Sequence, residues 1–219
     1  SVGLGFGLCS VLFFFWLLLN GEPGYGVMVV EASLAVLLGA CLYYRVKVRT
    51  SEAVAEARPR VLKRAKLSVF LLIAFLIAAG SAAVPYVNSY RQDPHGQGDA
   101  VSVWNMRARF IFRGGTHWRD GFSTLLSHPD YPLLLPLSVA RSWQFAGNDS
   151  TSAPALIAFL FTFATIGLVA SSLSVLHTRG QGLLAGLLLL GTPFLIRHGA
   201  SQYADLPMAF FILAAVVLI

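Results

Sequence analysis

The chain has 219 residues, of which 56% are hydrophobic and only 12% charged, and its formal net charge is +6. With a mean hydropathy of +0.69, this composition excludes an ordinary soluble globular domain. It predicts an all-α membrane protein, specifically a polytopic transmembrane helix bundle, because the apolar runs lack strand-period alternation and a helix satisfies its own backbone groups in lipid.

Long apolar runs predict six membrane spans, because a helix needs roughly 20 mainly apolar residues to cross a bilayer core. The expected spans are Val2–Leu19, Val27–Tyr44, Leu67–Tyr86, Ala153–Leu176, Leu183–Ile196 and Leu206–Ile219. Three of them fall in residues 1–86 and three in 153–219. The first run has neither a Met nor a basic segment before it, unlike a signal peptide, and the last is apolar where the sequence stops. We therefore expect a fragment of a larger protein with a truncated last span.

Basic residues concentrate between the second and third spans. Residues 45–66 hold half of the chain's Lys and Arg against two Glu. The positive-inside rule places this linker in the cytoplasm, and by alternation the segment 87–152 becomes a large extracytoplasmic loop. The positive charge is thus interpreted as a topology signal and a contact with anionic membrane lipids, and it gives no indication of nucleic-acid binding.

The loop begins with a helical pattern from Ala100 to Arg113. Val101, Trp104, Ala108 and Ile111 recur at three- and four-residue steps and form an apolar stripe, whereas Asn105, Arg109 and Arg113 form a polar row on another face. Such a helix suits the membrane interface, where its Arg side could meet phosphate. An amphipathic helix packed on the bundle explains the same pattern.

Asp99 opens this helix. An Asp at that position is favoured as an N-cap, because its carboxylate accepts hydrogen bonds from free backbone N–H groups. It is also a carboxylate a few residues beyond the outer end of the third span, where it could take part in chemistry. Both interpretations are open from the sequence.

A second candidate is the motif His128-Pro-Asp-Tyr-Pro132. Its two prolines fix φ and stop a helix, so Asp130 and Tyr131 should be held in a stiff turn. The apolar residues Leu133–Leu137 then predict a re-entrant or surface helix. The alternative is a turn that anchors at the membrane interface through Tyr131.

Asp205, at the outer mouth of the last span, is a third candidate, because an ionisable group beside an apolar run is costly and by default functional. Capping is its alternative, with Pro207 early in the helix. Glu31 lies in or near a span and has the same status, but no partner is evident in the sequence. The topology places Asp99, His128, Asp130 and Asp205 on the outer side, where a bundle could bring them around one cavity.

Three segments together resemble a known family. GDAVSVWNMRARFIFRGG, HPDYPLLLP and QYADLPMAFF are similar to the bacterial members of the GT-C glycosyltransferase superfamily, nearest to its protein O-mannosyltransferase-like and aminoarabinose-transferase-like group. The resemblance covers residues 99–219. One departure is that two spans precede the one before the loop, whereas the family's acidic loop usually follows the first span.

The resemblance implies transfer of a sugar from a polyprenyl-phosphate donor to a protein, lipid or glycan acceptor, on the extracytoplasmic side of a bacterial inner membrane. Asp99 matches the family's catalytic acidic position and would act as general base. Arg107, Arg109 and Arg113 would stabilise the donor phosphate. Substrate binding would involve Trp104, Asn105, His128, Asp130, Tyr131 and Asp205. Some superfamily members use a metal, so a divalent cation at Asp130 or Asp205 is left open.

Two other classes of function fit the composition. A transporter or lipid-carrier flippase would use the same acidic residues as a substrate or proton path, and it predicts charged groups deep in the spans and broken helices. A non-catalytic scaffold would use the loop to bind a partner, although this leaves the carboxylates and arginines without a purpose.

Overall fold

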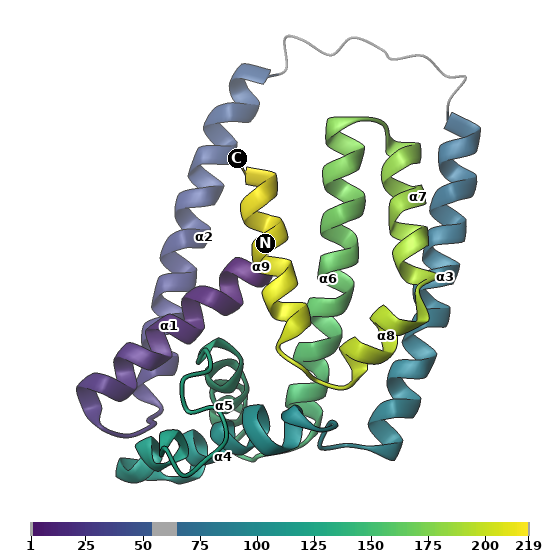
Figure 1. Cartoon of the computed structure of the whole chain (residues 1–219). Helices are drawn as coiled ribbons and strands as arrows, with labels where there is room; N and C mark the ends of the chain where they lie inside the picture. The colour runs from purple at the N-terminus through teal and green to yellow at the C-terminus, as the bar shows by residue number, and fades with distance from the viewer. Residues whose placement is uncertain (1, 54–64, 219) are drawn as a thin grey trace.

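The computed structural model describes residues 2–53 and 65–218. Helix makes up 81% of it, and the described residues form no strand, which confirms the all-α class. The helices are α1 (Val2–Asn20), α2 (Gly26–Ala53), α3 (Ala65–Gln92), η2 (Ala100–Trp104), α4 (Asn105–Arg113), η3 (Gly115–Phe122), α5 (Leu134–Ala146), α6 (Ser152–Leu176), α7 (Arg179–Leu190), α8 (Pro193–Ala200) and α9 (Asp205–Leu218). Figure 1 shows their arrangement.

Two of these helices are long and apolar enough to cross a membrane, namely α3 over Ser68–Gln92 and all of α6. Counting the bent pair α7 and α8 as one span gives a third. The apolar parts of α1, α2 and α9 are shorter. The composition therefore supports membrane-spanning helices among the described residues, and the complete six-span topology stays a prediction.

The expected fifth span, Leu183–Ile196, is wrong as a single straight helix. The chain breaks between α7 and α8, whose axes differ by 64°. Pro193 explains the break, because it lacks an N–H group and disfavours helical backbone in the preceding residue. Thr192 accordingly has φ −97° and ψ 97°, and α8 begins directly at the proline.

The helices pack around α6 in two hydrophobic cores. One core joins α6 to α1, α4, α5 and α9, with Phe13, Trp143 and Phe161 fully or almost fully buried. The other joins α6 to α3, α7 and α8. Helices α6 and α7 approach closely at Gly182, where a Cβ atom would lie 2.2 Å from the carbonyl oxygen of Ala170. A small residue at such a crossing lets two backbones meet.

The segment between α3 and α6 is folded against the first core (Figure 1). The helix expected near Leu133–Leu137 is present as the start of α5. Residues 135–140 are all buried, so the surface alternative is wrong, and the re-entrant alternative stays a prediction. The predicted basic linker at 45–66 is also partly helical, because α2 continues to Ala53. Residues 54–64 of that linker lie outside the described residues.

Candidate functional site

The predicted helix after Asp99 exists, but it opens with a wide turn. The N–H of Asn105 donates to the carbonyl oxygen of Ala100, five residues back, so η2 is a π-helical turn joined to α4. Asp99 has αR backbone angles and makes no capping hydrogen bond with its side chain. The N-cap interpretation is therefore wrong, and the carboxylate of Asp99 is exposed. Single π-turns of this kind are frequent at functional sites.

The extra residue in the π-turn changes which side chains face the core. Trp104, Ala108 and Ile111 are buried as expected, whereas Val101 at the start of the predicted stripe is 45% exposed. Asn105 was assigned to the polar row and is 2% exposed. A π-turn shifts the helical register by about one residue, so a 3.6-residue period cannot hold across it.

Arg107 is fully buried, which the sequence did not indicate. Its Nη2 donates to the main-chain carbonyl oxygens of Ser127 and His128, and its guanidinium lies 5.7 Å from the centre of the Phe122 ring. Burial away from water lowers the pKa of Arg107 from its ordinary value, and the Asp130 carboxylate opposes this shift. In this arrangement Arg107 holds the loop that carries the HPDYP motif.

The HPDYP motif forms the stiff turn that its prolines predict. The N–H of Tyr131 donates to the carbonyl oxygen of His128, 3.1 Å away. The Tyr131 ring lies between two others: the His128 ring at 4.4 Å and the Trp104 ring at 5.3 Å, both nearly parallel to it. The structure thus brings three predicted substrate-binding residues into one aromatic stack.

The connector between α8 and α9 docks on the residues just before η2. The side-chain amide of Asn105 donates to Gln202 Oε1 and to the carbonyl oxygen of His95, each at 3.0 Å. The backbone N–H of Gln97 donates to the carbonyl oxygen of Ser201 at 3.3 Å. Two of the three segments that carry the resemblance therefore lie in direct contact.

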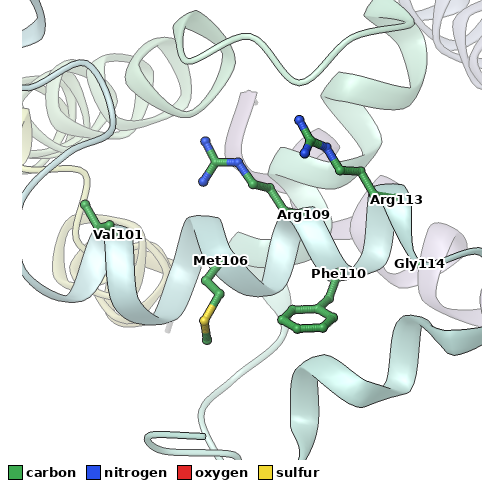
Figure 2. Close-up of a pocket in the computed structure, with 6 residues that line it drawn as sticks. All are labelled: Val101, Met106, Arg109, Phe110, Arg113 and Gly114. Carbon is green, nitrogen blue, oxygen red and sulfur yellow. The ribbon is translucent and has the colours of Figure 1, made fainter.

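Arg109 and Arg113 line a shallow groove of about 480 Å³, which we call the arginine groove. Its other lining residues are Val101, Met106, Phe110 and Gly114. In Figure 2 the two guanidinium groups extend to one side of the helix, and Met106 and Phe110 extend to the other. The lining therefore combines cationic groups on one side of the helix with apolar side chains on the other.

Asp149, which the sequence reasoning did not single out, neutralises part of this charge. Arg113 donates to its carboxylate at 2.5 Å, and Arg109 Nε lies 3.4 Å from the same oxygen. The hydrogen bond from Arg113 lowers the pKa of Asp149 from its ordinary value, with Arg109 adding to the shift. Arg113 remains 64% exposed and Arg109 26% exposed, so both guanidinium groups remain accessible to water.

Asp205 pairs with His198, a residue that the sequence reasoning also missed. Their Oδ2 and Nε2 atoms lie 3.4 Å apart. The ring of His198 stacks on Phe194 and meets the edge of Tyr203. His198 and Asp205 are seven positions apart in a predicted loop, and this spacing does not indicate a pair. The two side chains meet only because the chain turns at Gln202.

The arginine groove does not bring the acidic candidates together. Asp99 and Asp130 are exposed, and the lining of the arginine groove includes none of Asp99, Asp130 and Asp205. Among the described residues, no group of three or more His, Cys, Asp or Glu side chains could hold a metal ion. The geometry therefore gives no support for a cation at Asp130 or Asp205.

Glu31, which lacked a partner in the sequence, forms a buried ion pair with Arg141. Arg141 Nε lies 2.7 and 2.8 Å from the two carboxylate oxygens, and its Nη2 lies 2.6 Å from Oε2. The Glu31 side chain is 5% exposed and that of Arg141 19%. This bidentate geometry satisfies both charges and joins α2 to α5.

Comparison of the chain with protein-family models, with curated proteins and with solved structures finds no match. The site is therefore described by its own geometry.

Proposed function

We propose that this chain belongs to an integral-membrane glycosyltransferase with a GT-C-like bundle, which moves a sugar from a polyprenyl-phosphate donor to a protein, lipid or glycan acceptor. In this proposal the enzyme lies in a bacterial inner membrane, and residues 87–152 lie on the extracytoplasmic side. The proposal combines the resemblance of residues 99–219 with the arginine groove.

The observation that carries the proposal is the pairing of two guanidinium groups with apolar side chains in the arginine groove. A polyprenyl phosphate is an anion attached to an apolar chain, so it needs both kinds of contact. Arg109 and Arg113 would bind the phosphate through charge-assisted hydrogen bonds. The isoprenoid chain would then pass across the helix towards its apolar side, which carries Met106 and Phe110. Charge develops on this phosphate as the sugar leaves, and fixed cations stabilise it.

The other residues divide into three roles in this proposal. Asp99 is exposed at the start of η2 on the same helical segment as the groove, and it would accept the proton of the acceptor hydroxyl. The exposed ring of His128, at the end of the stack, would contact the sugar, and the buried Trp104 and the intervening Tyr131 would hold that ring in place. Arg107, which is buried, would hold the HPDYP loop in place while Arg109 and Arg113 bind the phosphate.

The test uses the protein in proteoliposomes with a panel of radiolabelled polyprenyl-phosphate sugars and a bacterial envelope extract that supplies protein, lipid and glycan acceptors. It measures transfer of the label to an acceptor together with release of the free polyprenyl phosphate. Asp99→Asn should lower turnover by at least about 100-fold, since a general base contributes about 10²–10⁴-fold. Arg113→Gln should also lower turnover. Asp120→Asn, which removes another exposed carboxylate, should leave it unchanged. No release by the unaltered protein with any donor would refute the proposal.

A transporter or lipid-carrier flippase is the second candidate, and two observations favour it. The Glu31–Arg141 pair buries a carboxylate on the apolar part of α2, and the 64° bend between α7 and α8 is compatible with one broken span. Both features are typical of transporters. Movement of a fluorescent polyprenyl phosphate between leaflets, without release of sugar and abolished by Glu31→Gln, would support this function instead.

A further inference from the structure

A second groove lies between α3, α7 and α8 and has no role in the proposed sugar transfer. It encloses about 560 Å³ between α3, α7 and α8, and we call it the lateral groove. Its wall on α3 consists of Pro85 and the small side chains Ala78, Ser81 and Ala82, and the opposite wall includes Leu187 and Ile196. It shares no residue and no helix with the arginine groove.

The lateral groove exists because the chain bends beside it. The 64° break between α7 and α8 turns α8 away from the line of α7, and Gly191 and Pro193 at the break also line the groove. Small residues on α3 leave the space unfilled. The volume falls within the range of about 300–1,000 Å³ that is typical of pockets for small molecules.

The open side of the lateral groove faces the bilayer if α3 spans it. Only 11% of the apolar window of α3 is buried, so most of this helix is uncovered by the described residues. The apolar walls therefore favour a hydrocarbon chain as occupant over a polar solute.

One charged residue distinguishes the lateral groove from ordinary lipid-facing surface. Arg197 of α8 lines it and is exposed, and no carboxylate of a described residue lies within 4.0 Å of its guanidinium. An Arg can lay its aliphatic stem along an apolar wall while its charged group stays at the interface. Arg197 thus supplies a cation beside an apolar channel.

We propose that the lateral groove binds a bilayer phospholipid with an anionic headgroup. One acyl chain lies between α3 and the α7–α8 break, and the phosphate receives charge-assisted hydrogen bonds from Arg197. Charge-assisted hydrogen bonds from a guanidinium to phosphate are among the stronger ones in proteins, which favours an anionic headgroup over a zwitterionic one. This lipid is separate from the polyprenyl-phosphate donor, because its groove is formed by different helices.

The test measures lipid binding to the whole chain by native mass spectrometry. Phosphatidylglycerol and phosphatidylcholine with identical acyl chains are added separately to delipidated protein in detergent. We expect phosphatidylglycerol to bind about fivefold more tightly, the factor typical of one basic residue near an anionic lipid. Arg197→Gln should remove this preference. Ser81→Phe, which places a ring in the groove from an exposed position, should weaken binding of both lipids.

The matched control is Arg179→Gln, which removes an exposed arginine at the start of α7, outside the groove lining. It should leave the preference unchanged. Equal loss with Arg179→Gln and Arg197→Gln would mean nonspecific attraction and would overturn the proposal. Retention of full binding by Ser81→Phe would also overturn it. Displacement of phosphatidylglycerol by an equimolar amount of undecaprenyl phosphate would assign the groove to the carrier lipid instead. None of these outcomes depends on sugar transfer.

Discussion

Asn105 and Gln202 are joined by a 3.0 Å hydrogen bond between side chains that lie 97 positions apart in the chain. Asn105 also binds the carbonyl oxygen of His95, so one buried amide connects η2 and α4 both to the preceding loop and to the α8–α9 connector. This bond fixes how the Asp99 segment lies against the Asp205 segment.

Asn105→Ala should therefore lower the free energy of unfolding by about 1–3 kcal/mol, because it leaves the buried Gln202 Oε1 and the partly buried His95 carbonyl without their donor. The measurement is chemical unfolding in detergent. A double-mutant cycle with Gln202→Ala should give a coupling energy well above zero, since the two side chains are in contact. Ser102→Ala, at an exposed position on the same segment, should change stability by less than about 0.5 kcal/mol. Additive effects of the two alanines would contradict a shared bond.

Because Glu31 and Arg141 form a buried ion pair, we expect replacement of one partner to lower the stability of the fold much more than replacement of both. Arg141→Met alone leaves a buried carboxylate without its partner and should cost about 3–5 kcal/mol. Combining it with Glu31→Leu removes both charges and should restore most of the stability, because well-packed apolar residues can replace a buried ion pair. Thermal unfolding of the two single variants and the double variant checks this. A double variant as unstable as either single one would refute it.

We expect the contribution of the Asp149 carboxylate to the stability of the folded chain to be lost in acid. Its pKa is lower in the folded chain than its ordinary value of 3.8, mainly because of Arg113. A depressed carboxyl pKa stabilises the folded state above the ordinary pKa, and this stabilisation is lost as pH falls through about 4 towards the folded pKa. The unfolding midpoint of the unaltered protein should exceed that of Asp149→Asn at pH 7. The difference should shrink below pH 4, whereas a pH-independent difference would contradict the pairing.

We expect that no residue larger than glycine fits at position 96. Its φ is +79°, and a Cβ atom there would lie 2.6 Å from that of Ala100 and 3.0 Å from the carbonyl oxygen of Ser201. Gly96→Ala should destabilise the chain by more than about 1 kcal/mol, because it combines strain with overlap. Gly39→Ala is the matched control, since nothing lies within 4 Å of its Cβ position. Alanine should be neutral or stabilising in that helix, and equal losses at both positions would refute the account.

Much of the fold was predictable because long apolar runs determine where helices lie. The expected first span differs from α1 by one residue at its end, and the expected fourth differs from α6 by one residue at its start. The HPDYP turn was also predictable, since two prolines restrict the backbone strongly. In these cases local chemistry alone selects the conformation.

The candidate site was less predictable, because its main features depend on contacts between distant segments. Nothing in the sequence marks the π-turn at Ala100–Trp104, which buries Asn105 and Arg107. The partners of Arg113 and Glu31 lie 36 and 110 positions away. Such pairs follow from the packing of helices, and the spacing of residues in a single segment does not contain them.

The bond between Arg107 and the HPDYP loop has a consequence for tolerance to substitution. Arg107 donates to the main-chain carbonyls of Ser127 and His128 and uses neither side chain. Many residues at 127 can therefore present the same carbonyl. At 128 the left-handed φ of +53° favours glycine or asparagine as a replacement. In a saturation library selected for folding, we expect diversity at 127, a narrow set at 128 and only arginine at 107, although all three positions share one contact.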